Sequence, residues 1–326
     1  MILVYVETSA VEGISEVSLE TVTFARELSV AGGGVPIDAV VVGPMPEGGA
    51  TELASYGVRN VHHAAGDDFG LFSGAATATA VIAARQAAGS VVVMAGGTNR
   101  GNEVVARVAT RLDVPMAANV VAFHGLSPFV VTRQVVGGAA LEEMRLGKRP
   151  AVFSVAGHAV EPVPAETPGT GSVVPLAVVP SPEDLLVRVA SVEGVDTDDA
   201  DSLKSARVVV GAGRGAGGPE GFGDVLELAD LLGGTLGVSR VVTSLGWRPH
   251  HEQVGQTGSR ISPEVYIPCG ISGAIQHWAG CASSKVILAI NTDAEAPMMT
   301  KATYAVVGDM HEVVPAINEE IRNRRG

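Results

Sequence analysis

Polar side chains gather in one stretch near the end of the chain, HEQVGQTGSRISPEVYIPCGISGAIQHWAG, residues 251–280. They lie among apolar neighbours and are Gln253, Gln256, Thr257, Ser272, Gln276 and His277. Burying polar groups without hydrogen-bond partners is costly, and a polar ligand could satisfy them. The stretch therefore indicates a binding site for a polar molecule.

The segment GISGAIQHW gives this cluster a geometry. Ser272 follows Gly270 and precedes a helix-like run, so we expect Ser272 to be the N-cap of a helix. Ser272 and Gln276 then share one helix face, and Gly273 and His277 share the neighbouring one. His277 could donate a hydrogen bond or supply a positive charge to a ligand that approaches the helix start. A capped helix with a core histidine is the simpler interpretation for one residue, but the cluster favours a site.

A glycine-rich turn follows a hydrophobic run in VVVGAGRGAGGPEGFGD, residues 208–224. Gly213, Gly215 and Gly218 form the pattern G-x-G-x-x-G between a predicted strand and a predicted helix, which is typical of a dinucleotide-binding turn. Arg214 is unusual there, because a Rossmann turn keeps small residues at this place and relies on its backbone amides. The turn predicts a dinucleotide, and Arg214 argues against a plain NAD site.

Composition excludes several classes of protein. The chain has 326 residues, 46% of them hydrophobic and 4% aromatic, which predicts a globular protein of two domains. A net charge of −13 argues against a nucleic acid or an anionic membrane as partner. The opening MILVYVETSA has no basic region and is typical of a strand, and no apolar run is long enough for a spanning helix. We therefore expect a cytoplasmic protein without membrane insertion.

No metal site is expected. Cys269 and Cys281 have neither zinc nor iron–sulfur spacing and are interpreted as small core residues in a reducing cytosol. The histidines at 62–63 and 250–251 are adjacent pairs, and adjacent side chains on a strand point apart.

Strands and helices alternate in residues 1–115, where β-branched runs such as IDAVVVG are followed by stretches such as SLETVTFARELS. This alternation predicts a mostly parallel sheet with helices on its faces. Residues 129–160 indicate strands with turns, added as an antiparallel edge. Residues 161–205 are rich in proline and acid, which favours an extended linker. We predict an N-terminal α/β domain over 1–160 and a C-terminal domain over 206–326.

The C-terminal domain begins with the glycine-rich turn and continues with PEGFGDVLELADLLGG, an amphipathic helix that we expect to stop at Gly233 and Gly234. TLGVSRVVTSLGW, which carries Ser239 and Arg240, is predicted as a strand and a turn. The fold class is α/β, with a nucleotide-binding-like sheet first and a Rossmann-like domain second.

Residues 206–321 closely resemble the C-terminal, FAD-binding domain of the electron-transfer flavoprotein alpha subunit. The matching segments are GRG at 213–215, GVSR at 237–240, QVGQTG at 253–258, GISGAIQH at 270–277, AIN at 289–291, EAP at 295–297 and VGD at 307–309. QVGQTG followed by GISGAIQH is the specific part of this pattern. The first 160 residues resemble the same family less sharply, mainly through GNEVVARVATRLDVPMAANVV at 101–121.

The resemblance implies one non-covalent FAD and a role for each matched residue. Arg214 would lie near the diphosphate, where a guanidinium suits phosphate. His277 would approach the carbonyl end of the flavin, Thr257 would hydrogen-bond its central ring nitrogen, and Arg240 would lie near the ring, so that these three tune its reduction. The other matched binding positions are Ser239, Gln253, Val254, Gly255, Gln256, Ser272, Gly273, Ala274, Ile275, Gln276, Asn291, Asp309 and Met310.

The resemblance also implies an electron carrier, and not a stand-alone enzyme. It would pair with a beta subunit that holds AMP or a second FAD, and it would not be a functional monomer. Electrons would come from flavin dehydrogenases, such as the acyl-CoA dehydrogenases of fatty acid beta-oxidation, and pass to a quinone oxidoreductase.

Three alternatives stay open at this point. The first is a subunit of a flavin-based electron-bifurcating complex that uses NADH. The second is an NAD(P)-dependent oxidoreductase, although the sequence lacks an obvious acid–base pair for a hydride site. The third is a scaffold, which would have no use for the polar cluster.

Overall fold

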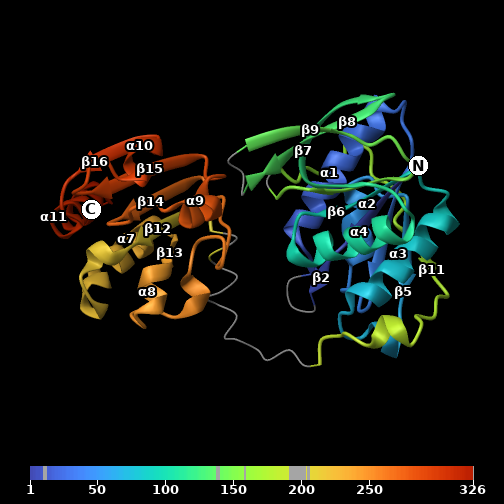
Figure 1. Ribbon diagram of the computed structural model, residues 1–326, viewed down its shortest axis with the longest axis horizontal. Helices are drawn as coiled ribbons and strands as arrows, with labels where there is room; N and C mark the ends of the chain where they lie inside the picture. The colour runs from blue at the N-terminus through green and yellow to red at the C-terminus, as the bar shows by residue number, and fades with distance from the viewer. Residues whose placement is uncertain (10–12, 137–139, 158, 191–202, 204–205, 326) are drawn as a thin grey trace. The chain divides into compact units, whose positions relative to one another are not determined.

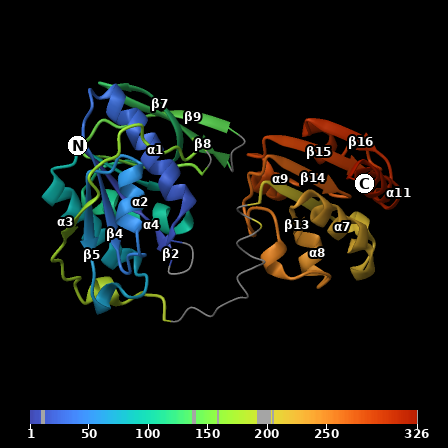
Figure 2. The ribbon, with the colours of Figure 1, turned by 180° about the vertical axis from the view of Figure 1, so that it is seen from behind.

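A computed structural model describes the chain from residue 1 to residue 325 except residues 10–12, 137–139, 158, 191–202 and 204–205. The chain divides into two compact units. The first is made of Met1–Val135 and Ala140–Val192, and the second of Val136–Ala139 and Glu193–Gly326. Both are α/β units (Figures 1 and 2), which confirms the predicted fold class.

The first unit is built on one large mixed sheet. Its strands are β1 (Ile2–Val6), β4 (Ile37–Val42), β5 (Asn60–Ala64), β6 (Val92–Gly96), β7 (Met116–Leu126), β8 (Phe129–Val135), β9 (Ala140–Arg145), β10 (Ala151–Val155) and β11 (Ser172–Pro175). In the part of the chain that is described, their order is β11-β5-β4-β1-β6-β10-β7-β8-β9. β8 and β9 form the expected antiparallel edge, whereas β10 pairs in parallel with β6 and β7 inside the sheet.

Helices cover both faces of this sheet: α1 (Glu16–Ala31), α2 (Gly49–Ser55), α3 (Gly74–Ala88) and α4 (Asn99–Arg111). Successive side chains of a strand point to opposite faces of the sheet, so β1 contributes side chains to a hydrophobic core on each face. Val4 and Val6 pack with residues of α1 and α2, whereas Leu3 and Tyr5 pack with residues of α3 and α4. A sheet covered on both sides needs strands that are apolar throughout, as the run ILVYV is.

Residues 161–190, which fall within the predicted linker, pack along the first unit. β11 pairs in parallel with β5, and the guanidinium of Arg26 donates to the carbonyl of Val163 at 2.7 Å. In the remainder of the predicted linker, 191–205, the structure describes Leu203 alone. The domain boundaries therefore stay a prediction.

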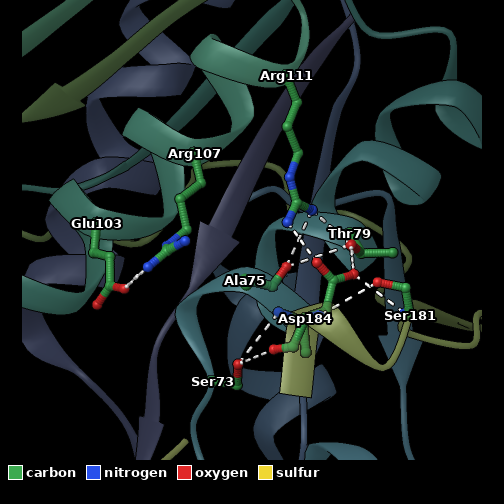
Figure 3. A network of polar contacts seen from close by, with 9 residues as sticks. Ser73, Ala75, Thr79, Glu103, Arg107, Arg111, Ser181 and Asp184 are labelled. Carbon is green, nitrogen blue, oxygen red and sulfur yellow. Dashed lines mark hydrogen bonds and ion pairs between the residues drawn. The ribbon is translucent and has the colours of Figure 1, made fainter. Parts of the chain in front are cut away.

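An ion pair fastens this segment to the first unit (Figure 3). Arg111 on α4 contacts Asp184 with 2.6 Å between Nη2 and Oδ1, and Thr79 on α3 donates to Oδ2 of Asp184 at 2.7 Å. Ser73, the N-cap of α3, donates to the backbone carbonyl of Asp184 at 2.7 Å. The short 3-10 helix Glu183–Leu185 is thus held by side chains of two helices.

The second unit has a parallel sheet. Its strands are β12 (Val208–Ala212), β13 (Thr235–Val238), β14 (Val265–Cys269), β15 (Val286–Asn291) and β16 (Tyr304–Val307), in the order β13-β12-β14-β15-β16. The helices are α7 (Gly223–Leu232), α8 (Arg240–Ser244), α9 (Ile275–Cys281), α10 (Pro297–Lys301) and α11 (Met310–Arg325). α7 ends at Gly233 with φ of 62°, which confirms the predicted stop.

This strand order creates a crevice. From β12 the chain moves to β13 on one side, and then crosses to β14 on the other side. The connections after β12 and β14 therefore diverge, and a gap opens between the carboxyl ends of these two strands. Open α/β sheets bind ligands at such a point.

Candidate functional site

A pocket of about 590 Å³ lies at the carboxyl end of the second sheet. The loops after all five strands of this sheet reach it, through Arg214, Ser239, Gly270, Thr292 and Gly308. Its volume is within the range of sites for cofactors and other small molecules.

All predicted binding residues except Ile275 line this pocket. They are Arg214, Ser239, Arg240, Gln253, Val254, Gly255, Gln256, Thr257, Ser272, Gly273, Ala274, Gln276, His277, Asn291, Asp309 and Met310. The side chain of Ile275 is 62% exposed and is not part of the lining. The structure thus brings the predicted set together, while what each residue binds stays a prediction.

Sequence reasoning missed several lining residues. They are Val241, Gly270, Ile271, Thr292, Asp293, Ala296 and Gly308, whereas Gly215, which also lines the pocket, belongs to the predicted dinucleotide-binding turn. Ile271, Thr292 and Gly308 each adjoin a predicted residue after a strand, and Val241 adjoins Arg240 in α8. Their signal was available, because the carboxyl ends of parallel strands meet at one edge of a sheet.

The glycine-rich turn packs against the loop after β14. A Cβ atom on Gly213 would lie 2.2 Å from the carbonyl oxygen of Gly270, so no other residue fits there. The Gly213 amide donates to Cys269 and the Gly215 amide to Gly270, at 3.0 and 3.2 Å. These two amides are therefore used within the protein and do not form the expected phosphate cradle.

The helix after this turn also departs from the Rossmann pattern. α7 begins only at Gly223, and two short 3-10 helices, Arg214–Ala216 and Pro219–Phe222, precede it. Arg214 is exposed and lines the pocket, so its guanidinium is the strong anion-binding group of this turn.

The two motifs QVGQTG and GISGAIQH contact one another through their backbones. The Gln256 amide donates to the carbonyl of Gln276 at 2.8 Å. Gln253 is buried, and its side chain accepts from Thr243 at 2.6 Å and donates to the hydroxyl oxygen of Thr257 at 3.1 Å. Because the Thr257 oxygen accepts this bond, its hydrogen is free to donate to a ligand.

The expectation that Ser272 caps a helix is wrong. α9 begins at Ile275, its N-cap is Ala274, and the Ser272 carbonyl instead accepts from the amide of Met298 at 3.1 Å. Gly273, with φ of +77°, reverses the chain before the helix can start. Ser272 and Gln276 are therefore not on one helix face, although both line the pocket.

His277 is 6% exposed and its Nε2 lies 2.7 Å from the hydroxyl of Tyr266. Burial lowers the pKa of His277 to about 4, so the imidazole is neutral near pH 7. The structure thus favours a hydrogen-bonding role for His277 over the positive charge also considered from the sequence.

Two buried polar atoms of pocket-lining residues lack a hydrogen-bond partner among the described residues. They are Nδ1 of His277 and Oγ of Ser239. Buried polar atoms are paired in most native proteins, so a ligand with its own donors and acceptors would satisfy them. This observation fits a flavin, whose ring carries carbonyl and nitrogen atoms along one side.

Asn291 and Asp309 also have structural duties. The Asn291 amide donates to the carbonyl of Ile271 at 3.1 Å, and its oxygen accepts from the amide of Asp293 at 3.1 Å. Asp309 accepts from the amide of His311 at 2.9 Å and thereby caps α11. Asn291 could still offer its second amide hydrogen and a lone pair to a ligand, and Asp309 its remaining lone pairs.

Comparison with known proteins connects this geometry to a family. The family model for the electron transfer flavoprotein domain matches residues 2–181, and that for the electron transfer flavoprotein FAD-binding domain matches residues 202–282. The electron transfer flavoprotein subunit alpha of Syntrophomonas wolfei subsp. wolfei is 35% identical over 311 residues, covering 95% of each chain. That of Mycobacterium tuberculosis strain H37Rv is 37% identical over 333 residues, covering 100% of this chain and 99% of its own.

Proposed function

The chain belongs to the electron transfer flavoprotein family as an alpha subunit with an FAD-binding domain, and we propose that it binds one FAD non-covalently in this pocket. The observation that carries this proposal is the pair of unpartnered polar atoms, Oγ of Ser239 and Nδ1 of His277. Both residues line the pocket, which the loops after the strands of the second sheet reach. A cofactor with acceptors and donors would satisfy both.

In the proposed binding mode, different residues of the pocket contact the diphosphate and the flavin ring of FAD. Arg214, beside the β12–β14 crevice, would contact the diphosphate. Thr257 and His277 would donate hydrogen bonds to the flavin ring, and Arg240 would stand near the ring as a permanent cation. Bound FAD supplies reversible one- and two-electron chemistry; these residues orient it and favour its negatively charged forms.

The Rossmann-like alternative with NAD is disfavoured by the glycine turn. The amides of Gly213 and Gly215 donate to protein carbonyls, and α7 does not begin at the turn. A pyrophosphate would therefore depend on Arg214 more than on backbone amides.

The proposal extends to an electron carrier that works with a beta subunit, which holds AMP or a second FAD. Electrons would come from flavin dehydrogenases, such as acyl-CoA dehydrogenases, and pass to a quinone oxidoreductase. The bifurcating alternative differs in the partner, which would contribute a second FAD and react with NADH. The names of the relatives, each called a subunit alpha, support a partner subunit.

The test is to purify the chain co-expressed with its proposed beta subunit and to record the absorption spectrum. A yellow complex that releases FAD on denaturation supports the proposal. A colourless complex that binds NADH would overturn it. Counting the adenine nucleotides and flavins released per complex separates AMP from a second FAD.

The cytoplasmic location stays a prediction. Among the described residues, no helix is both long and apolar enough to cross a bilayer. A relative from Arabidopsis thaliana, 36% identical over 238 residues, is named as mitochondrial.

A further inference from the structure

Tyr266 is a fully buried hydrogen-bond partner of His277. It belongs to β14, an inner strand of the second sheet, and is 0% exposed. Its hydroxyl lies 2.7 Å from Nε2 of His277. The neighbouring strand makes room for this hydroxyl at Gly211, where a Cβ atom would lie only 2.6 Å from it. The pair of Tyr266 and His277 thus connects an inner strand of the sheet to a pocket-lining residue of α9.

Counting hydrogens decides how this pair is arranged. A neutral imidazole carries one N–H, and a tyrosine hydroxyl carries one O–H. If Nε2 of His277 held the hydrogen, the O–H of Tyr266 would have no acceptor in the described part of the chain. If Tyr266 donates to Nε2, both atoms are satisfied and the hydrogen of the imidazole is on Nδ1.

The resulting N–H has a direction. The two ring nitrogens face nearly opposite sides of an imidazole, so Nδ1 points away from Tyr266. His277 lines the pocket, and Nδ1 is buried without a partner among the residues described. A buried donor without an acceptor is costly, and the cost is relieved when a ligand brings an acceptor.

We propose that Tyr266 is a positioning residue that fixes His277 as the Nδ1–H tautomer, so that His277 offers the bound cofactor a neutral hydrogen-bond donor. This proposal rests on the proposed function, because the acceptor is then a carbonyl oxygen of the FAD ring. The arrangement selects ligands that present an acceptor to His277 and disfavours those that present a donor.

The first experiment replaces Tyr266 in the complex with the beta subunit. Tyr266→Phe keeps the ring and removes the hydroxyl, so Nε2 loses its partner and the tautomer is no longer fixed. We expect FAD to bind about tenfold more weakly. Tyr304→Phe is the matched control, because Tyr304 is an exposed tyrosine of the same sheet and lies outside the pocket lining. It should leave FAD affinity unchanged.

A double-mutant cycle separates positioning from general support of the fold. In a His277→Ala background, Tyr266→Phe should have little further effect on FAD affinity, because Tyr266 acts on the cofactor only through His277. If Tyr266→Phe weakens binding equally in both backgrounds, its role is structural and the proposal is overturned. An unchanged affinity in the single variant would overturn it as well.

A direct readout needs no change at Tyr266. Nitrogen-15 NMR of histidine-labelled wild-type protein distinguishes a protonated from an unprotonated ring nitrogen, and the signals missing in His277→Ala identify those of His277 among the eight histidines of the chain. We expect His277 to show a protonated Nδ1 and an unprotonated Nε2 near neutral pH, with and without FAD. The opposite tautomer, or a mixture, would overturn the proposal even if Tyr266→Phe does not fold.

The two proposals fail in different ways. If the wild-type complex binds no FAD, the proposed function fails, while the NMR spectrum still reports the tautomer. If the complex binds FAD but His277 is protonated at Nε2, the proposed function stands and the role of Tyr266 is wrong.

Discussion

The strand order reverses in both sheets, but the two units differ in whether the protein itself pairs the polar groups at the carboxyl ends of the strands. In the first unit, Glu7 follows β1 and Thr98 follows β6, at the point where strand order reverses. Thr98 donates to the Glu7 carboxylate and accepts from the amide of Gly101 at 2.8 Å. Ser18 accepts from the Glu7 amide at 2.9 Å. The first unit thus satisfies these groups from its own chain.

The second unit leaves two polar groups at the carboxyl ends of its strands unsatisfied. Ser239 follows β13 and His277 follows β14, and Oγ of the first and Nδ1 of the second lack partners among the described residues. Both units have a glycine-rich turn after a strand, AGGTNRG in the first and GAGRGAGG in the second. The glycines therefore do not distinguish the two edges, whereas unpaired polar atoms beside the pocket do. The first unit also has unpaired buried atoms, Nδ1 of His62 and Oγ of Ser90, but they lie within β5 and before β6, away from the carboxyl edge of its sheet.

The largest effect is expected from closing the pocket of the second unit. Gly273 has φ of +77°, and a Cβ atom there would lie 2.5 Å from the amide nitrogen of Met298. Gly273→Ala should therefore lower the free energy of unfolding by about 2–4 kcal/mol and weaken FAD binding severely. Chemical denaturation and FAD titration measure the two losses.

Gly217→Ala is the matched control for this change. Gly217 has a similar φ of +79°, but a Cβ atom there would meet no atom within 4 Å. Only the backbone strain, of about 1–3 kcal/mol, is then expected, with FAD binding retained. Equal losses in both variants would show that the close approach at Gly273 is not needed.

The second prediction concerns Asp184→Asn, which should destabilise the first unit without changing the pocket of the second. Burial raises the pKa of Asp184, but hydrogen bonds from Thr79 and Ser181 and the charge of Arg111 outweigh it, so the pKa lies below its usual value. Asp184→Asn should lower the free energy of unfolding of this unit by about 1–2 kcal/mol. Differential scanning calorimetry measures the loss, and FAD affinity should not change.

The pH dependence of that loss checks its cause. A carboxyl whose pKa is depressed by folding stabilises the native state above its unfolded pKa, and this contribution disappears as pH falls through the folded pKa. Wild-type protein and Asp184→Asn should therefore converge in stability in strong acid. A difference that is constant with pH would contradict the ionic explanation.

Much of the fold was predictable, since short-range patterns determine it. Alternating strands and helices, the stop at Gly233 and the antiparallel strands after residue 129 all follow from local periodicity and turn chemistry. β11 was not predicted, because its stability comes from pairing with β5 and from the distant ion pair of Asp184 with Arg111. Contacts between residues so far apart in the sequence produce no recognisable pattern within a proline-rich stretch.

The candidate site was predicted as a set of residues but not as a geometry. The motifs named its lining, yet Ser272 is not a cap, because Gly273 turns the chain before α9. The bond between Tyr266 and His277 was also missed, since it joins a strand to a helix across the sheet surface. Neither feature follows from spacing along the sequence.

The third prediction concerns charge in the open pocket. Arg240 is exposed and lines the pocket, so its charge is partly screened by water. Arg240→Ala should lower the reduction potential of bound FAD by roughly 20–60 mV, because the negatively charged flavin loses a nearby cation. Redox titration measures it, with Arg260→Ala, an exposed arginine outside the lining, as control. An unchanged potential would mean that Arg240 does not act on the ring.

The smallest effect on stability is expected from a change at Glu7, which follows β1 in the first unit and accepts a hydrogen bond from Thr98. Burial raises its pKa, and this outweighs the hydrogen bond from Thr98 and the charge of Arg100, which lower it. A carboxyl with a raised folded pKa binds its proton more tightly in the native state. Native stability therefore falls as pH rises from the unfolded pKa through the folded one, and stays lower at neutral pH.

Glu7→Gln removes that charge and keeps an oxygen that can accept from Thr98. We expect the variant to melt about 2–4 °C above wild type at neutral pH, with the gain shrinking to nothing as pH falls below the unfolded pKa of Glu7. FAD affinity should stay the same, because Glu7 belongs to the first unit and does not line the pocket of the second. A variant that melts below wild type at neutral pH, with a deficit that grows with pH, would show that the ionised carboxylate is needed. The carboxyl edge of the first sheet would then be stabilised by a charged group, Glu7. The two units would then differ in the charge of these groups as well as in their hydrogen bonding, because Ser239 and His277 of the second unit are neutral.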